Sequence, residues 1–316
     1  MIVTGRPTKY QREVYGELRE IARDFFDFDW TALSVVPRTN VLVVGSTGAG
    51  KTYLCRRLAH ELGLPLLETQ YASWVVTGAG SRGGAHTLRL VYSFAQAHKR
   101  GIILLDEADK LGSDEGTSDW TRSVHLEVFS VMDKKVVSAV LEGSDASETA
   151  PRFRVSAEEI EQRLLRGHLL IGAGAWQDLW RRPQSAGFAQ VDEKSSDVQL
   201  PTYKELVAKI RPEILNRFHS KVLFLPPLSR SDYKWLVEET LDQLPENFRP
   251  IMSEAALATI DQAVEMQKGF RWIEELVGCA IRSVRTSVPK NTLTRELAAR
   301  LCSPPSLRTD EIGTSV

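Results

Sequence analysis

The stretch VLVVGSTGAGKT, residues 41–52, decides how this chain of 316 residues is interpreted. Four apolar residues typical of a buried strand lead into a glycine-rich turn, and Lys51 to Leu62 suits a helix. Such a turn directs backbone N–H groups and the positive end of a helix dipole toward an anion. The residues predicted to cradle nucleotide phosphates are Gly45, Ser46, Thr47, Gly48, Ala49, Gly50, Lys51 and Thr52.

The last two residues of this pattern carry its chemistry. The Lys51 ammonium is expected to reach the β- and γ-phosphates, and the Thr52 hydroxyl is expected to ligate Mg²⁺. The alternative is a glycine-rich loop without a function, which the flanking strand and helix disfavour. The pattern therefore predicts ATP and Mg²⁺ as cofactors.

An acidic pair follows a second apolar run. Residues 102–105 read IILL and are followed by Asp106 and Glu107. A buried strand in a parallel sheet delivers such side chains to the edge where α/β proteins bind ligands. Asp106 is expected to hold Mg²⁺, and Glu107 to polarise the water that attacks the γ-phosphate. An ordinary solvated turn is the alternative, and the phosphate-binding pattern upstream makes it less favourable.

The remaining pattern predicts a parallel α/β domain over residues 41–227, with helices between strands. An amphipathic helical segment, 1–40, precedes it. A small helical domain, 228–288, follows, with helices near 230–244, 253–267 and 270–287 and N-caps at Ser229 or Ser231 and at Ser253. A polar tail, 289–316, ends the chain. The strands are expected at 41–44, 64–67, 102–105, 169–173 and 222–225, and two polar segments, 142–163 and 181–202, are interpreted as surface insertions.

Composition narrows the function classes. Hydrophobic residues make up 42% and charged residues 26% of the chain, as in soluble globular proteins. The net charge of −1 provides no general positive field for nucleic acid. The three widely spaced cysteines indicate neither a metal site nor a disulfide framework, and no signal peptide or membrane span is recognisable, so a cytoplasmic protein is expected.

Three further motifs, together with the phosphate-binding loop, resemble the AAA+ ATPases, in the branch that contains ClpX, HslU and the second module of the Clp disaggregases. Residues 103–110, ILLDEADK, look like the Walker B segment of that branch. Residues 211–218, RPEILNRF, are similar to the element that carries the arginine finger, here Arg217. Residues 269–271, GFR, resemble the sensor 2 motif, here Arg271. The resemblance covers about residues 41–288.

This resemblance implies a cation supplied by a neighbouring subunit and contact between Arg271 and the nucleotide. A trans-acting Arg217 requires a head-to-tail ring or spiral, of about six subunits in this family. The resemblance is incomplete, because residues 77–84 lack the aromatic of a threading pore loop and offer only Arg82. Trp74 is interpreted as a core residue, and no sensor 1 residue is assigned.

The leading expectation is an ATPase that remodels a macromolecule, with protein favoured over nucleic acid and no membrane partner. A motor or switch acting on DNA is the second possibility. A P-loop kinase is a third, and it would need no arginine from a neighbour. A helicase is disfavoured by the chain length and by the lack of second-domain motifs.

Overall fold

The computed structural model describes residues 7–74, 86–112, 119–142, 153–180, 200–218 and 221–286. The chain divides into two compact units, Met1–Pro227 and Leu228–Val316. Each unit is described separately below. Among the described residues, no helix is both long and apolar enough to cross a membrane.

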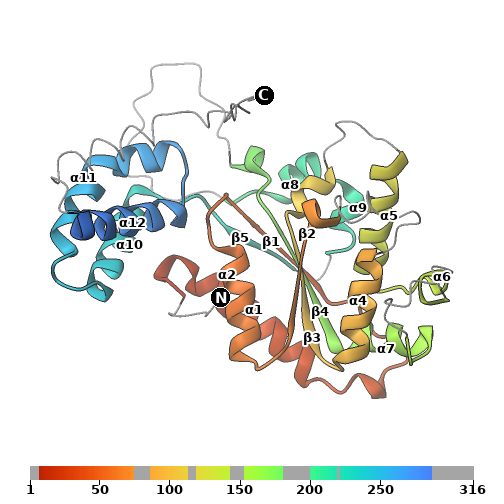
Figure 1. Cartoon of the computed structure of the whole chain (residues 1–316). Helices are drawn as coiled ribbons and strands as arrows, with labels where there is room; N and C mark the ends of the chain where they lie inside the picture. The colour runs from red at the N-terminus through yellow and green to blue at the C-terminus, as the bar shows by residue number, and fades with distance from the viewer. Residues whose placement is uncertain are drawn as a thin grey trace, which may run out of the picture. The chain divides into compact units, whose positions relative to one another are not determined.

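A five-stranded, wholly parallel sheet forms the centre of the first unit (Figure 1). The strand order is β2-β3-β4-β1-β5, which confirms the predicted α/β fold class. The strands are β1 (Asn40–Gly45), β2 (Leu66–Gln70), β3 (Gly101–Asp106), β4 (His168–Gly174) and β5 (Lys221–Leu225). Because β4 lies between β1 and β3, the phosphate-binding turn and the acidic pair lie two strands apart at the same edge.

The second strand starts later than its apolar run predicts. Residues 64–67 were expected in the strand, but the backbone N–H of Leu64 donates to Ala59 O (2.9 Å) and so belongs to the end of the preceding helix. Pro65 has no N–H for the sheet ladder, although its carbonyl accepts from Ile102 N at 3.0 Å. The strand therefore begins at Leu66.

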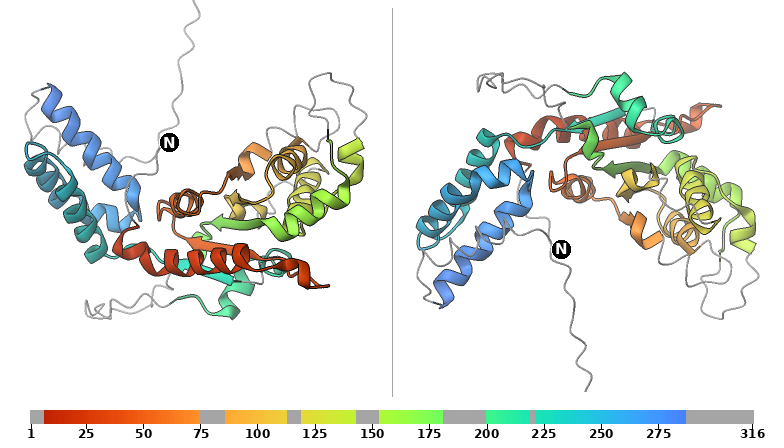
Figure 2. Two further views of the ribbon diagram at one scale, coloured as in Figure 1. Left: turned by 90° about the horizontal axis from the view of Figure 1, so that it is seen from below. Right: turned by 90° about the horizontal axis from the view of Figure 1, so that it is seen from above.

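Helices cover both faces of the sheet (Figures 1 and 2). On one face lie α1 (Lys9–Asp27) and α2 (Lys51–Glu61), and on the other lie α4 (His86–Ala97), α5 (Asp119–Met132) and α7 (Ala157–Gly167). Side chains of a strand alternate between its faces, so Val41 and Val43 pack with α1 and α2, whereas Leu42 and Val44 pack with the opposite layer. The three central strands, β3, β4 and β1, are buried on both faces, which explains their continuous apolar sequence.

The segment 142–163 is not wholly a surface insertion. Its second half begins α7, which Ser156 caps by accepting from Glu159 N at 3.2 Å. Ile160 and Leu164 are spaced one turn apart and are buried in the core. The insertion interpretation is wrong there because an amphipathic helix places its few apolar residues on one face. Residues 143–152 and 181–199 lie outside the described ranges.

Short elements complete the first unit. They are α6 (Ser138–Glu142), α8 (Tyr203–Lys209), α9 (Pro212–Leu215) and the 3₁₀ turns η1 (Trp30–Ala32), η2 (Ala108–Gly112) and η3 (Gln177–Leu179). A capping box at Thr202 and Glu205 starts α8. This helix begins at the end of the second predicted insertion, 181–202.

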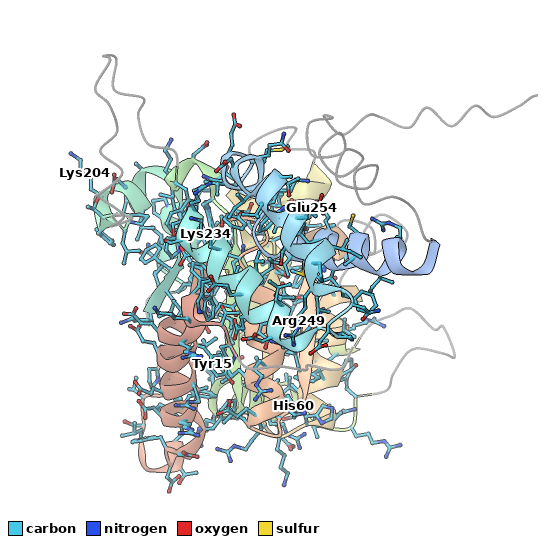
Figure 3. All side chains as sticks on the ribbon, turned by 90° about the vertical axis from the view of Figure 1, so that its left-hand side faces the viewer. Tyr15, His60, Lys204, Lys234, Arg249 and Glu254 are labelled. Atoms are coloured by element: carbon cyan, nitrogen blue, oxygen red, sulfur yellow. The ribbon has the colours of Figure 1, made fainter. Side chains whose placement is uncertain are left out.

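The second unit consists of α10 (Arg230–Gln243), α11 (Arg249–Glu265) and α12 (Phe270–Thr286). Ser229, not Ser231, caps α10, in a capping box with Asp232. The N-cap expected at Ser253 is wrong, because α11 already begins at Arg249 with Pro250 in its first turn, where a missing N–H costs nothing. The exposed residues Lys234, Arg249 and Glu254 are labelled in Figure 3. The predicted polar tail, 289–316, lies outside the described residues.

Candidate nucleotide-binding site

The glycine-rich loop closes between the end of β1 and the start of α2. Gly48 (φ 78°) and Gly50 (φ 86°) both adopt left-handed backbone conformations that side chains disfavour. A hydrogen bond from Ala49 N to Ser46 O (3.1 Å) holds the turn. The loop therefore has the backbone conformation that its sequence predicted.

The two polar residues that open α2 point in different directions. Lys51 Nζ donates to the carbonyl oxygens of Gly45 (2.8 Å) and Ser46 (3.0 Å), so its ammonium lies along the loop. The Thr52 hydroxyl donates to Asp106 Oδ2 at 2.5 Å. The Thr52 hydroxyl and the Asp106 carboxylate, predicted to share one metal ion, therefore lie side by side.

The acidic pair ends β3 as the sequence predicted. Asp106 Oδ1 also accepts from the backbone N–H of Glu107 at 2.9 Å, so both of its oxygens are engaged. Glu107 is exposed and has a φ of 58°, an unusual value for a residue with a side chain. Backbone strain of this kind concentrates at functional sites.

Gln177 is a site residue that sequence reasoning missed. It follows β4, the strand between β1 and β3, and its Nε2 donates to Thr47 Oγ1 of the loop at 2.7 Å. Trp176, with a φ of 39°, turns the chain there, and Ala175 N donates to Asp109 Oδ1 at 3.1 Å. The sequence offered no polar residue at the end of the predicted strand. The turn at Trp176 instead brings in Gln177, three residues beyond Gly174, the last residue of β4.

The helix α1 also reaches the loop. Gln11 is 1% exposed, and its Nε2 donates to Ala49 O at 3.1 Å. The neighbouring Tyr10 hydroxyl donates to Pro226 O, just before the end of the first unit. The sequence predicted that this helix packs onto the domain but did not predict its contact with the loop.

Arg217 lies at the other end of β1 from the loop. Its carbonyl oxygen accepts from Asn40 Nδ2 at 2.7 Å, and Asn40 is the first residue of β1. The Nη2 atom of Arg217 pairs with Asp133 Oδ2 at 3.2 Å. From Asn40 to Gly45 the strand rises roughly 16 Å, at about 3.3 Å per residue. The structure therefore does not bring Arg217 to the phosphate loop of its own chain.

Arg271 belongs to the second unit, where it is exposed in the first turn of α12. The start of this helix is anchored by two buried aromatic residues in T-shaped contact, Tyr233 and Trp272, with ring centroids 5.2 Å apart. The Tyr233 hydroxyl accepts from Gly269 N at 2.7 Å, and Trp272 Nε1 donates to Thr259 Oγ1 at 3.0 Å. Arg271 is thus presented from a well-packed helix terminus.

Two further predictions concern the segment after β2. Trp74 is 2% exposed and packs in the core, which confirms its interpretation as a core residue. Residues 77–84, including Arg82, lie outside the described ranges.

Together, the parallel sheet, the glycine-rich loop with its lysine and threonine, and the acidic pair two strands away define a P-loop nucleoside triphosphatase. Residues 41–166 match the model of the ATPase family associated with various cellular activities. This region is therefore an ATP-binding AAA ATPase domain, and the chain as a whole resembles ClpX.

Similar proteins include ATP-dependent Clp protease ATP-binding subunit ClpX 3 of Methylococcus capsulatus. It is 24% identical over 89% of this chain and 71% of its own length. The ClpX subunit of Azotobacter vinelandii is 23% identical over 80% of this chain and 62% of its own length. ATP-dependent zinc metalloprotease FtsH 2 of Symbiobacterium thermophilum is 33% identical over a shorter region, 34% of this chain and 18% of its own length. The chain thus spans only part of each of these relatives.

Proposed function

We propose that this chain is a subunit of a head-to-tail ring or spiral of about six copies in which ATP hydrolysis drives the remodelling of a protein client. One observation carries the assembly: Arg217 is anchored at the amino end of β1, while the phosphate loop follows the carboxyl end. A cation placed so far from its own site supports a role at the site of another subunit.

In this proposal the loop of one subunit binds the triphosphate. The backbone N–H groups of residues 45–52 and the start of α2 would surround the β- and γ-phosphates. Lys51 would turn from the carbonyl oxygens of Gly45 and Ser46 to the phosphates, which offer its ammonium a full negative charge. Arg271 of the second unit is proposed to contact the same nucleotide through its guanidinium.

The side chains of Thr52 and Asp106 fit a Mg²⁺ site. A hydroxyl and a carboxylate converge there, and hard oxygen donors of this kind, completed by phosphate oxygens and water, are the ligands that Mg²⁺ prefers. Bound in this position, the metal would neutralise charge on the β- and γ-phosphate oxygens.

Glu107 is the proposed general base. Its carboxylate would orient a water molecule in line with the γ-phosphate and accept a proton as the oxygen–phosphorus bond forms and ADP leaves. Glu107 is exposed, whereas both carboxylate oxygens of Asp106 are already engaged. One acid is therefore left for the water while the other serves the metal.

The trans role of Arg217 can be tested by mixing two defective variants. Arg217→Ala retains a complete loop, and Lys51→Ala retains Arg217, so each variant alone should lose at least about tenfold in turnover. A mixture should recover activity, because a Lys51→Ala subunit can present its Arg217 to the intact loop of its neighbour.

The matched control is the mixture of Lys51→Ala with the double variant Lys51→Ala/Arg217→Ala, which contains no intact loop and should stay inactive. Nucleotide binding to each variant, followed with a fluorescent ATP analogue, separates loss of binding from loss of turnover. Equal inactivity of both mixtures would contradict a shared site.

A protein client is favoured by the names of the similar proteins, which are subunits of an ATP-dependent protease.

A further inference from the structure

The guanidinium of Arg217 is enclosed by groups of its own chain. Nη1 donates to Glu213 O at 2.8 Å, and Nη2 pairs with Asp133 Oδ2 at 3.2 Å. The guanidinium carbon lies 4.4 Å from the ring centroid of Phe129, on α5. Nε is buried without a hydrogen-bond partner among the described residues. The side chain keeps only 25% of its surface exposed.

This enclosure conflicts with phosphate binding. A guanidinium grips an oxyanion through two parallel N–H bonds, either from Nη1 and Nη2 or from Nε and Nη2. Here Nη1 donates to Glu213 O and Nη2 to Asp133, while Nε is buried. Arg217 as placed therefore offers no complete edge to an incoming phosphate, and its side chain must move before it can act.

The backbone around the pair does not need to move. Asn40, which is completely buried, donates through Nδ2 to Met132 O at 2.8 Å and to Arg217 O at 2.7 Å. One side chain thus ties together the backbone on either side of the Asp133–Arg217 pair. Within this frame, rotation of the Arg217 side chain is sufficient to release it, and such a rotation is a small and fast motion.

A second arginine lowers the free-energy cost of this rotation. Arg38 Nη1 lies 3.4 Å from Asp133 Oδ1, while Arg217 pairs with Oδ2 of the same carboxylate. A partly buried carboxylate that loses its only cation is strongly destabilised. Because Arg38 stays, Asp133 keeps a counter-charge after Arg217 has left.

We propose that Asp133 is a positioning residue, an internal counter-ion that holds Arg217 until a neighbouring subunit presents the phosphates of its bound nucleotide. Assembly then exchanges one anion for another: Arg217 leaves the carboxylate and binds the γ-phosphate across the interface. The inference rests on the trans role of Arg217 proposed above. It adds that the carboxylate and the neighbour's nucleotide compete for the same guanidinium.

The test is the dependence of ATPase turnover on protein concentration. Asp133→Asn keeps the size of the side chain and removes its charge. The protein concentration for half-maximal turnover should fall by about fivefold, the effect of one modest ion pair. The turnover per subunit at saturating concentration should not change.

Two variants separate competition from a structural effect. Arg38→Ala leaves Asp133 in place with Arg217 as its remaining cation, so its half-maximal concentration should rise, in the opposite direction. If a thermal melt shows that Asp133→Asn folds poorly, the half-maximal concentration of Arg38→Ala still tests the inference. In the Arg217→Ala background, Asp133→Asn should change nothing.

The outcomes distinguish this inference from the proposed function. If Asp133→Asn lowers saturating turnover to the level of Arg217→Ala, the carboxylate holds Arg217 in its active position and the inference fails. An unchanged half-maximal concentration also refutes it, provided that Arg217→Ala is inactive. Full activity of Arg217→Ala at every concentration would overturn the trans role itself, and the inference with it.

Discussion

At the scale of single residues, the site combines side chains at the ends of three neighbouring strands or in the segments that follow them, at one edge of the sheet. Thr52 and Asp106 meet because β1 and β3 flank β4, and Gln177 follows β4 itself. Its amide contacts the phosphate loop at Thr47, and it follows the strand that lies between the strands carrying the loop and the acidic pair. A neutral donor at this position can bind either the loop or the γ-phosphate.

We expect Gln177→Ala to lower kcat by about tenfold or more, because one hydrogen bond to a charged group is lost in the transition state. KM for ATP should change less. Thr47→Val is the matched control, since it removes the bond between Thr47 and Gln177 but keeps the amide. Equal losses in both variants would indicate that Gln177 acts only by holding the loop, and steady-state kinetics distinguish the two cases.

At the scale of elements, a buried histidine links α7 to the sheet. This residue, His168, is the first residue of β4. His168 Nδ1 lies 2.8 Å from Arg163 O, and because a carbonyl can only accept, Nδ1 carries the proton. Nε2 is buried without a hydrogen-bond partner in the described part of the chain. Burial, and to a lesser extent the nearby Lys134 ammonium, lowers the pKa of His168 to about 4.

This histidine should make the fold sensitive to acid. Between pH 6.5 and 4 the unfolded chain binds a proton at His168 that the folded chain does not, so the free energy of unfolding falls as the pH falls. The loss should approach about 3 kcal/mol, from 1.36 kcal/mol per pKa unit. His168→Asn keeps a donor toward Arg163 O without titrating, and its urea-unfolding free energy should lose that much less over this range. Parallel pH profiles for the two proteins would contradict the assignment.

At the scale of the whole molecule, the nucleotide loop and Arg217 occupy opposite ends of β1. A subunit with its nucleotide loop and its cation at opposite ends of one strand offers two different surfaces to its neighbours. Contacts between unlike surfaces produce a ring when the rotation closes and a spiral when it does not. A single chain thus contributes only one of the two parts of each proposed active site.

The client can be identified by stimulation of turnover. We expect an unstructured protein such as casein to raise the ATPase rate severalfold, because engagement of the client is coupled to hydrolysis. Single- and double-stranded DNA at matched mass should leave the rate unchanged, as the net charge of −1 suggests. Stimulation by DNA alone would favour the nucleic-acid alternative. The Arg217→Ala variant controls for effects that do not depend on shared sites.

The sequence alone was sufficient to predict those features whose interacting residues lie close together in the chain. The phosphate loop, four of the five strand positions and the start of α10, expected at Ser229 or Ser231, depend on apolar runs, turn glycines and caps that act within a few residues. The same is true of Asp106 and Glu107, which end their own strand. These features were predictable because their causes are local.

Contacts between residues that are far apart in the sequence were decided only by the tertiary structure. Gln177 reaches Thr47 only because β4 lies beside β1 and the chain turns at Trp176. Asp133 and Arg217 are 84 positions apart in the chain, and Asn40 fixes the backbone on both sides of their pair. No local pattern encodes which charges meet after folding, since that depends on the order of strands in the sheet and on the packing of helices against it.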